Sequence, residues 1–300
     1  MNTPLELAEA YETDKNPLFS VLHSLGWGDL LNLGYFTPLT LLRLPGGLSS
    51  FQEDLVSRSL GLLRIQPGEQ VLDVACGAGH TTRRIAEQGA FATGIDLYPP
   101  HVAQARRQHG DDVRTNFLQA DATDLRSAPA FGDAAFDKVH CLEAAFHFGP
   151  DGRRAFLEEA YRLLKPGGRL VIVDFAWATG DPAEINAADP GRVVRDTWAF
   201  EEFEPLDRYI RHAIDIGYRP CHVHDWTRPV ARRFMTVGVL GAGLALSPAG
   251  RGLLGRVLPP LKDLTRAQWL SFSSIVLAHV PVQRASRYIA LVLDKPAREA

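Results

Sequence analysis

The sequence predicts an α/β fold built on a doubly wound, mostly parallel sheet of seven strands. The apolar run at 71–75 has the length of a buried strand, and a glycine-containing turn, a helical pattern and a second strand at 91–95 follow it. Strand and helix patterns keep alternating as far as 169–175, where RLVIVDF is nearly all apolar, as in strands buried on both faces. Such alternation predicts right-handed crossovers and helices on both faces of the sheet.

Composition limits the domain organisation and the functional class. The chain has 300 residues, 46% of them hydrophobic and 22% charged, which suits one well-buried domain with a sizeable insertion. A net charge of -3 without a long basic run argues against a nucleic-acid partner. Three cysteines are too few for a disulfide scaffold, and with no export signal at the N-terminus they indicate a cytoplasmic protein. The least polar stretch, 234–246, is too short for a membrane span.

The N-terminal part, residues 1–65, is predicted to be a helical flap. Helical patterns occur at 4–14, 17–25 and 50–63. Between the last two, GWGDLLNLGYFTP places aromatic residues among glycines, a composition that suits a mobile segment with aromatic faces. The alternative is that Tyr35 and Phe36 simply fill the base of a helix pair.

The turn after the first strand suits a nucleotide. Gly77 and Gly79 allow a ligand to approach the backbone, and the N–H groups that begin the next helix, at 81–88, favour a polar or negatively charged group. Asp96, at the end of the second strand, stands where nucleotide-binding sheets place an acid for two ribose hydroxyls. A dinucleotide site is disfavoured, because the turn lacks the third glycine of that fingerprint.

These segments carry a resemblance to a known family. DVACGAG at 73–79 resembles the first motif of the class I S-adenosylmethionine-dependent methyltransferases, and GIDL at 94–97 resembles the second, although Ala75 stands where the family usually has a glycine. Further likenesses are the segments ADATDL at 120–125, FD at 136–137 and RLLKPGGRL at 162–170. The chain is most similar to the ubiquinone, tocopherol and sterol-type enzymes. The resemblance implies a Rossmann-like sheet, S-adenosylmethionine as cofactor and a small-molecule acceptor.

The resemblance also assigns residues to the cofactor. Asp73 and Gly77 are expected at its amino-acid end, and Asp96 at its ribose. Asp121 is expected to accept from the adenine amino group while Ala122 offers its backbone N–H, although Asp121 as a cap of the following turn is the alternative. The full expected set is Asp73, Ala75, Cys76, Gly77, Gly79, Asp96, Leu97, Asp121, Ala122 and Leu142.

The expected catalytic residues follow the fourth strand, 135–141. The family carries E-x-x-x-H or a close variant there, which Glu143 and His147 fill, and a helical loop would place both on one face. An acceptor that loses a proton needs a base, and an imidazole oriented by a carboxylate suits that role, so His147 is the expected base. A structural core histidine is the alternative. The ring or hydroxyl of Tyr35 is expected to face the sulfonium methyl.

Residues 176–300 are expected to determine acceptor specificity. The predicted parts are an inserted helical lid at 178–205, a helix at 206–216, and strands at 218–225 and 287–293, which the family pairs antiparallel. The apolar, glycine-rich stretch 234–258 is expected to roof the pocket, which favours an apolar acceptor such as a terpenoid, polyketide or aromatic metabolite. A subunit interface in a homodimer is the alternative.

No metal is expected. His222 and His224 share one strand face and could ligate a metal together with the adjacent Asp225, but no further well-spaced ligand is evident and methyl transfer from sulfur needs none. The sequence therefore predicts a single methyltransferase domain over 1–300, with its cofactor core at 66–175, that acts on a small apolar acceptor in secondary metabolism. Two alternatives stay open: an enzyme of this fold that couples methylation to cyclisation, and a non-catalytic module that binds the cofactor.

Overall fold

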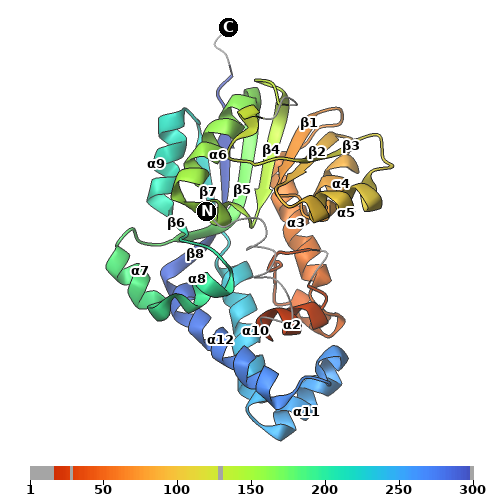
Figure 1. Ribbon diagram of the computed structural model, residues 1–300, viewed down its shortest axis with the longest axis vertical. Coiled ribbons are helices and arrows are strands. Elements are labelled where there is room, and N and C mark those ends of the chain that lie inside the picture. The colour runs from red at the N-terminus through yellow and green to blue at the C-terminus, as the bar shows by residue number, and fades with distance from the viewer. Residues whose placement is uncertain (1–16, 28–29, 128–130, 298–300) are drawn as a thin grey trace.

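The computed structural model describes residues 17–27, 30–127 and 131–297, which form a sheet with helices on both faces (Figure 1). Seven strands follow one another in the order β3-β2-β1-β4-β5-β8-β7, and an eighth, β6, pairs with β5. The predicted seven strands are therefore confirmed, and the two-residue β6 is too short to leave a pattern in the sequence. The strands are β1 (Gln70–Val74), β2 (Phe91–Asp96), β3 (Thr115–Gln119), β4 (Phe136–Leu142), β5 (Leu164–Trp177), β6 (Glu204–Pro205), β7 (Cys221–Asp225) and β8 (Ser286–Asp294).

The strand directions place four loops at one edge of the sheet. Strands β1 to β5 run parallel, with β1 between β2 and β4. Strand β8 runs antiparallel between β5 and β7, which confirms the predicted antiparallel pair. Because the carboxyl ends of parallel strands meet at the same edge, the residues that follow β1, β2, β3 and β4 come together there.

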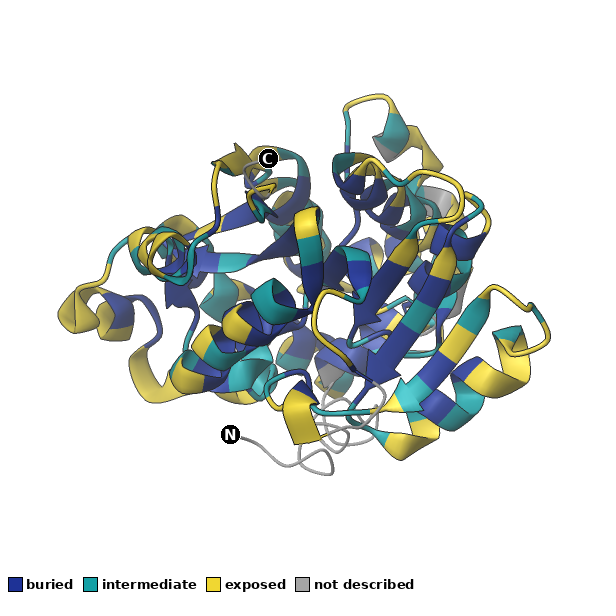
Figure 2. Ribbon diagram, turned by 90° about the horizontal axis from the view of Figure 1, so that it is seen from above, coloured by how far each residue is buried: buried dark blue, intermediate teal, exposed yellow. Residues whose placement is uncertain are grey.

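Helices bury both faces of the sheet, whose strands form the dark interior in Figure 2. Phe156 of α6 and Tyr209 of α9 pack in the cluster on one face, and Leu55 of α3 and Ile85 of α4 pack in the cluster on the other. The helices around the sheet are α3 (Ser49–Leu63), α4 (His80–Ala86), α5 (Pro99–His109), α6 (Gly149–Leu163) and α9 (Leu206–Ile216). To within two residues at each end, α3, α4 and α9 agree with the helices predicted at 50–63, 81–88 and 206–216.

A helical cap extends from the carboxyl edge of the sheet (Figure 1). Phe19 and Trp27 from the N-terminal segment pack in one cluster with Trp269 and Phe272. The helices of the cap are α2 (Pro17–Ser24), α7 (Pro182–Ala188), α8 (Val193–Thr197), α10 (Arg233–Ala245), α11 (Pro248–Val257) and α12 (Arg266–Ala285). The predicted flap thus packs against α12, whereas Ile185 and Val194 of the predicted lid belong to a separate apolar cluster.

Several predictions for the cap need refinement. The helix expected at 4–14 lies outside the described residues, whereas α2 agrees with the one expected at 17–25. The stretch 234–258 forms two helices, and α12 has no counterpart among the predictions. Short helical turns join these elements: η1 (Thr40–Gly46), η2 (Leu125–Ser127), η3 (Ala145–Phe148), η4 (Pro190–Arg192), the π-helical η5 (Arg228–Arg232) and η6 (Pro259–Leu261). Within the described ranges, no helix is both long and apolar enough to cross a bilayer.

Candidate active site

The turn between β1 and α4 has one packed side and one open side. Ala75 (φ 56°), Gly77 (φ 54°) and Gly79 (φ 85°) all have left-handed backbones. A Cβ added to Gly79 would lie 2.7 Å from a ring carbon of Phe117, whereas one added to Gly77 would meet no atom within 4 Å. Gly79 is therefore required by packing and Gly77 borders free space. The alanine at 75 adopts a conformation that costs a residue with a side chain about 1–2 kcal/mol.

Asp96 ties this turn to the end of β2. Its Oδ2 accepts the backbone N–H of Gly77 at 2.9 Å, and its Oδ1 accepts that of Tyr98 at 2.9 Å and lies 3.4 Å from Nδ1 of His101. The half-buried Leu97 follows it. These contacts hold the carboxylate beside the open face of Gly77, where the resemblance placed the ribose.

Asp73 points the other way, into the protein. Its Oδ2 accepts from the Thr82 hydroxyl at 2.6 Å, and its Oδ1 lies 3.0 Å from Nδ1 of His140, whose Nε2 is 3.1 Å from Oγ of Ser59. This placement differs from the expected contact with the amino-acid end of the cofactor: the carboxylate supports the turn from behind. Cys76 is likewise turned inward, since it packs in the cluster with Phe117, and burial raises the pKa of its thiol well above the usual range.

Strands β3 and β4 complete the edge. Oδ1 of the half-buried Asp121 accepts from the backbone N–H of Thr123 at 2.8 Å and from its hydroxyl at 2.7 Å, so the capping role that was the alternative is present. Ala122 packs in the core under the sheet edge, and Leu142 ends β4 half-buried. Residues after four adjacent strands thus border one surface, as an extended nucleoside requires.

Glu143, directly after β4, is anchored through one oxygen. Its Oε1 accepts the backbone N–H of Leu33 at 3.0 Å and the hydroxyl of Tyr288 at 2.5 Å. Burial raises the pKa of Glu143 to about 7, although both hydrogen bonds favour the carboxylate. Because both bonds fall on Oε1, Oε2 is left for a ligand.

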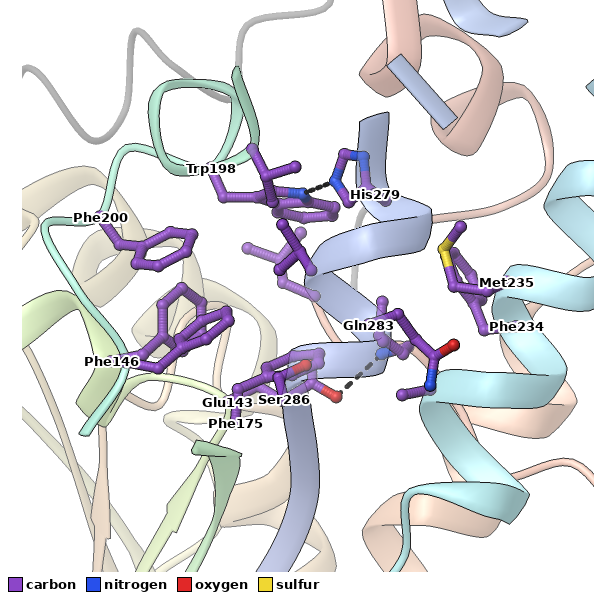
Figure 3. Close-up of a pocket in the computed structure, with 16 residues that line it drawn as sticks. Glu143, Phe146, Phe175, Trp198, Phe200, Phe234, Met235, His279, Gln283 and Ser286 are labelled. Carbon is purple, nitrogen blue, oxygen red and sulfur yellow. Dashed lines mark hydrogen bonds between the residues drawn. The ribbon is translucent and has the colours of Figure 1, made fainter. Parts of the chain in front are cut away.

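Glu143 lines an apolar cavity between the sheet edge and the cap (Figure 3). Phe146, Phe175 and Phe200 lie on one side, and Phe234 and Met235 of α10 lie on the other. The cavity and its mouth enclose about 680 Å³ of empty space, which includes the solvent at the mouth. The remaining lining residues are Leu31, Leu33, Val194, Trp198, Phe203, Ala231, His279, Val282, Gln283 and Ser286.

The structure separates His147 from Glu143, which corrects the expected pair. The backbone of Glu143 is left-handed (φ 50°) and η3 begins only at Ala145, so the two side chains do not share a helix face. His147 instead lines a polar pocket with Arg192 and Glu201, where its Nδ1 lies 3.3 Å from the carbonyl oxygen of Ala199. Burial lowers the pKa of His147 to about 4, which makes it a weak base.

Tyr35 is also placed differently from its expected role. The guanidinium carbon of Arg58 lies 4.0 Å from the centre of its ring, and the ring of Trp226 meets it edge-on at 5.7 Å. Phe36 is buried and stacks on Phe51 at 4.4 Å. The ring of Tyr35 thus contacts a cation of the protein itself, and both aromatic residues fill the base of α3, as in the alternative interpretation.

The metal alternative has no support in the described part of the chain. There, no three His, Cys, Asp or Glu side chains are grouped closely enough to hold a metal ion. His222 and His224 are exposed on the edge strand β7, and Asp225 is 3.0 Å from Arg287.

Comparisons with known proteins identify the family of this chain. The family model of the methyltransferase domain matches residues 71–168. The 27-O-demethylrifamycin SV methyltransferase of Amycolatopsis mediterranei (strain S699) is 32% identical over 234 residues, which cover 76% of this chain and 79% of that protein. The chain belongs to the class I S-adenosylmethionine-dependent methyltransferases. It is a small-molecule methyltransferase, and its cofactor is S-adenosylmethionine.

Two further proteins place this methyltransferase among its relatives. The 2-methyl-6-phytyl-1,4-hydroquinone methyltransferase of Synechocystis sp. (strain ATCC 27184 / PCC 6803 / Kazusa) is 29% identical over 218 residues, which cover 68% of this chain and 64% of that protein. The solved structure of the [4+2]-cyclase SpnF superposes with a TM-score of 0.64 over 95% of this chain and 94% of that one, at 19% identity. The second likeness shows a common fold.

The sequence left several residues of the methyltransferase cavity unnoticed. His279 and Gln283 of the cavity come from α12, far along the chain from the motifs, and Tyr288, which anchors Glu143, comes from β8. The indole N–H of Trp198 donates to Nε2 of His279 at 2.6 Å, which joins α8 to α12 across the cavity. The local signal for His279 and Gln283 is that a histidine and a glutamine stand within an otherwise apolar stretch.

The open face of Gly77 yields a prediction for the methyltransferase. A Gly77→Ala variant is expected to bind S-adenosylmethionine about tenfold or more weakly, as measured by calorimetric titration, because the new methyl group enters the space beside the turn. Gly68→Ala is the matched control, since Gly68 also has a left-handed backbone and open surroundings. Both variants should lose about 1 kcal/mol of stability. Equal affinities in the two would place the cofactor away from this turn.

Proposed function

We propose that this enzyme methylates a hydroxyl group of an apolar, ring-containing metabolite held in the aromatic cavity, with Glu143 as the base. The observation that carries the proposal is a carboxylate with one anchored oxygen, set among aromatic side chains at the end of β4. A carboxyl group with a pKa of about 7 is matched to proton transfer near neutral pH. Glu143 thereby takes the role that the sequence motif suggested for His147.

The cavity lining supports an apolar acceptor. Its walls are mostly aromatic and aliphatic, which favours a terpenoid, polyketide or aromatic compound over a charged metabolite. Nε2 of Gln283 is buried and has no hydrogen-bond partner among the described residues. It is therefore suited to donate to a second oxygen of the acceptor. The 27-O-demethylrifamycin SV methyltransferase is named for an oxygen acceptor, which is in line with a role in secondary metabolism.

For the cofactor we propose the surface bordered by Ala75, Gly77, Leu97, Asp121 and Leu142. Asp96 would take the ribose hydroxyls beside Gly77, with Asp73, Cys76, Gly79 and Ala122 shaping the surface from beneath. When bound, S-adenosylmethionine supplies a methyl group on a positively charged sulfur.

The cavity residues then have defined tasks. The aromatic walls exclude water and hold the acceptor in line with the methyl group. Oε2 of Glu143 takes the hydroxyl proton as the acceptor oxygen bonds to the methyl carbon and the carbon–sulfur bond breaks. The products are a methyl ether, S-adenosylhomocysteine and a protonated Glu143, which returns its proton to solvent after release.

The pKa of Glu143 predicts the pH dependence of the reaction. Below about pH 7 the carboxyl group is protonated and cannot accept a proton, whereas above pH 7 it is ionised. We therefore expect kcat to rise about tenfold per pH unit up to pH 7 and then to level off. Rates measured at saturating substrates from pH 5 to 9 test this. A kcat that stays level from pH 5 to 9 would point to a different base.

The acceptor itself is best found from material that purifies with the protein. Organic extracts of the purified enzyme, analysed by mass spectrometry before and after incubation with methyl-labelled S-adenosylmethionine, should contain an apolar compound that gains one labelled methyl group. A polar or phosphorylated acceptor would contradict the proposal.

A second candidate function is ring formation. This chain superposes on 94% of the [4+2]-cyclase SpnF. The apolar cavity of this chain could confine a polyene for cyclisation. The product mass separates the candidates, because a cycloaddition leaves the mass of the substrate unchanged whereas methylation adds one CH₂ group.

A further inference from the structure

The far end of the cap exposes apolar side chains that take no part in the cavity. We call this end the lid tip, residues 240–270; it comprises the end of α10, α11, η6 and the start of α12, and lies farthest from the sheet (Figure 1). Its large exposed apolar residues are Leu240, Leu244, Leu246, Leu253, Val257 and Leu270. Leu246 exposes 62% of its surface and Leu253 exposes 49%, so the described residues leave the tip incompletely covered.

The cavity does not account for these residues. Helix α10 contributes Phe234 and Met235 to the cavity from its first turn, and α12 contributes His279 and Gln283 from its last turns. The lid tip is formed by the opposite ends of the same two helices. Of the expected pocket roof at 234–258, only Phe234 and Met235 line the cavity. The cavity therefore does not account for the exposed apolar residues that follow them.

The charge of this region opposes that of the whole chain. Residues 240–270 contain four basic residues and one acidic residue, a formal charge of +3. The other 28 basic and 34 acidic residues give the rest of the chain a charge of -6. Arg256, Lys262 and Arg266 are exposed on the lid tip itself. Within α11, Leu253, Arg256 and Val257 share one exposed face, because they are three and four residues apart.

We propose that the lid tip docks on the surface of a lipid bilayer that carries anionic headgroups. Leucine and valine side chains enter the boundary between headgroups and acyl chains, while the arginine and lysine side chains meet the lipid phosphates. A second copy of this chain fits less well, since a symmetric contact between two lid tips would set the same basic residues against one another.

Sedimentation of the full chain with vesicles tests this proposal. We expect binding to phosphatidylcholine vesicles that contain about one third phosphatidylglycerol, at least about tenfold stronger than to phosphatidylcholine alone. Raising the salt to about 1 M should abolish most of it. Leu253→Asp and Arg256→Glu should each weaken binding about tenfold or more.

Matched controls separate the lid tip from general surface effects. Val113→Asp changes an exposed apolar residue next to β3, and Arg154→Glu changes an exposed basic residue on α6, so both should bind vesicles as the natural chain does. Circular dichroism and S-adenosylmethionine binding confirm that each variant is folded. Absence of vesicle binding, or equal losses in the controls, would overturn the proposal. So would a dimer in analytical ultracentrifugation that Leu253→Asp dissociates, because the tip would then be a subunit interface.

Discussion

Replacing Glu143 by glutamine is expected to lower kcat by about a hundredfold to ten-thousandfold, because the acceptor proton then has no base to receive it. Glutamine keeps the shape of the side chain, and its amide oxygen can still accept from the N–H of Leu33 and the hydroxyl of Tyr288. Affinity for S-adenosylmethionine should therefore stay close to that of the natural enzyme. Single-turnover rates with labelled cofactor, together with calorimetric titration, measure the two effects separately.

His147→Asn is the matched control for this prediction. His147 lies in the polar pocket beside Ala199 rather than in the cavity, so its variant should retain nearly the full rate. If His147→Asn loses the rate and Glu143→Gln keeps it, the sequence motif was the better guide and Glu143 has a structural role. The proposed acceptor class would be unaffected by that outcome.

His140→Leu is expected to lower the free energy of unfolding by about 3–5 kcal/mol. His140 is fully buried and lies within hydrogen-bond distance of Asp73 on one side and Ser59 of α3 on the other. With leucine at 140, the buried carboxylate of Asp73 would keep one side-chain hydrogen-bond partner among the described residues, the Thr82 hydroxyl. Urea unfolding followed by circular dichroism measures the loss.

Ser59→Ala provides the graded comparison. It removes one neutral partner of His140 and leaves the contact with Asp73 in place, so about 1 kcal/mol should be lost. If both variants lose only about 1 kcal/mol of unfolding free energy, water must form the hydrogen bond to Asp73 when the imidazole is absent. Folded His140→Leu should still bind S-adenosylmethionine, because the open face of the turn lies on the other side of β1.

The sheet and the cofactor edge could be predicted because their signals are local. The apolar run before Cys76, the glycines that follow it and Asp96 at a strand end each have a direct structural meaning within a few residues. The direction of Asp73 could not be predicted, since it depends on His140, which lies three strands later in the sequence but on the neighbouring strand of the sheet.

The catalytic side chains show where local patterns fail. The four-residue spacing of Glu143 and His147 indicates a common face only if the backbone is helical, and the left-handed backbone of Glu143 removes that condition. Tyr35 was a plausible partner for a cation, but only the packing of α3 shows that Arg58 occupies its ring. Helix α12 has apolar residues at exposed and buried positions alike, including the exposed Leu270 and Leu277, so periodicity does not mark it.

The double anchoring of Oε1 in Glu143 links chemistry to the completion of folding. One bond comes from Leu33, ahead of the sheet in sequence, and the other from Tyr288 in the last strand. A molecule whose first or final segment has not yet settled would retain the nucleoside surface but hold the carboxylate loosely. With Glu143 as the proposed base, we expect such an immature molecule to capture the methyl donor without consuming it, and turnover to start only when both segments are in place.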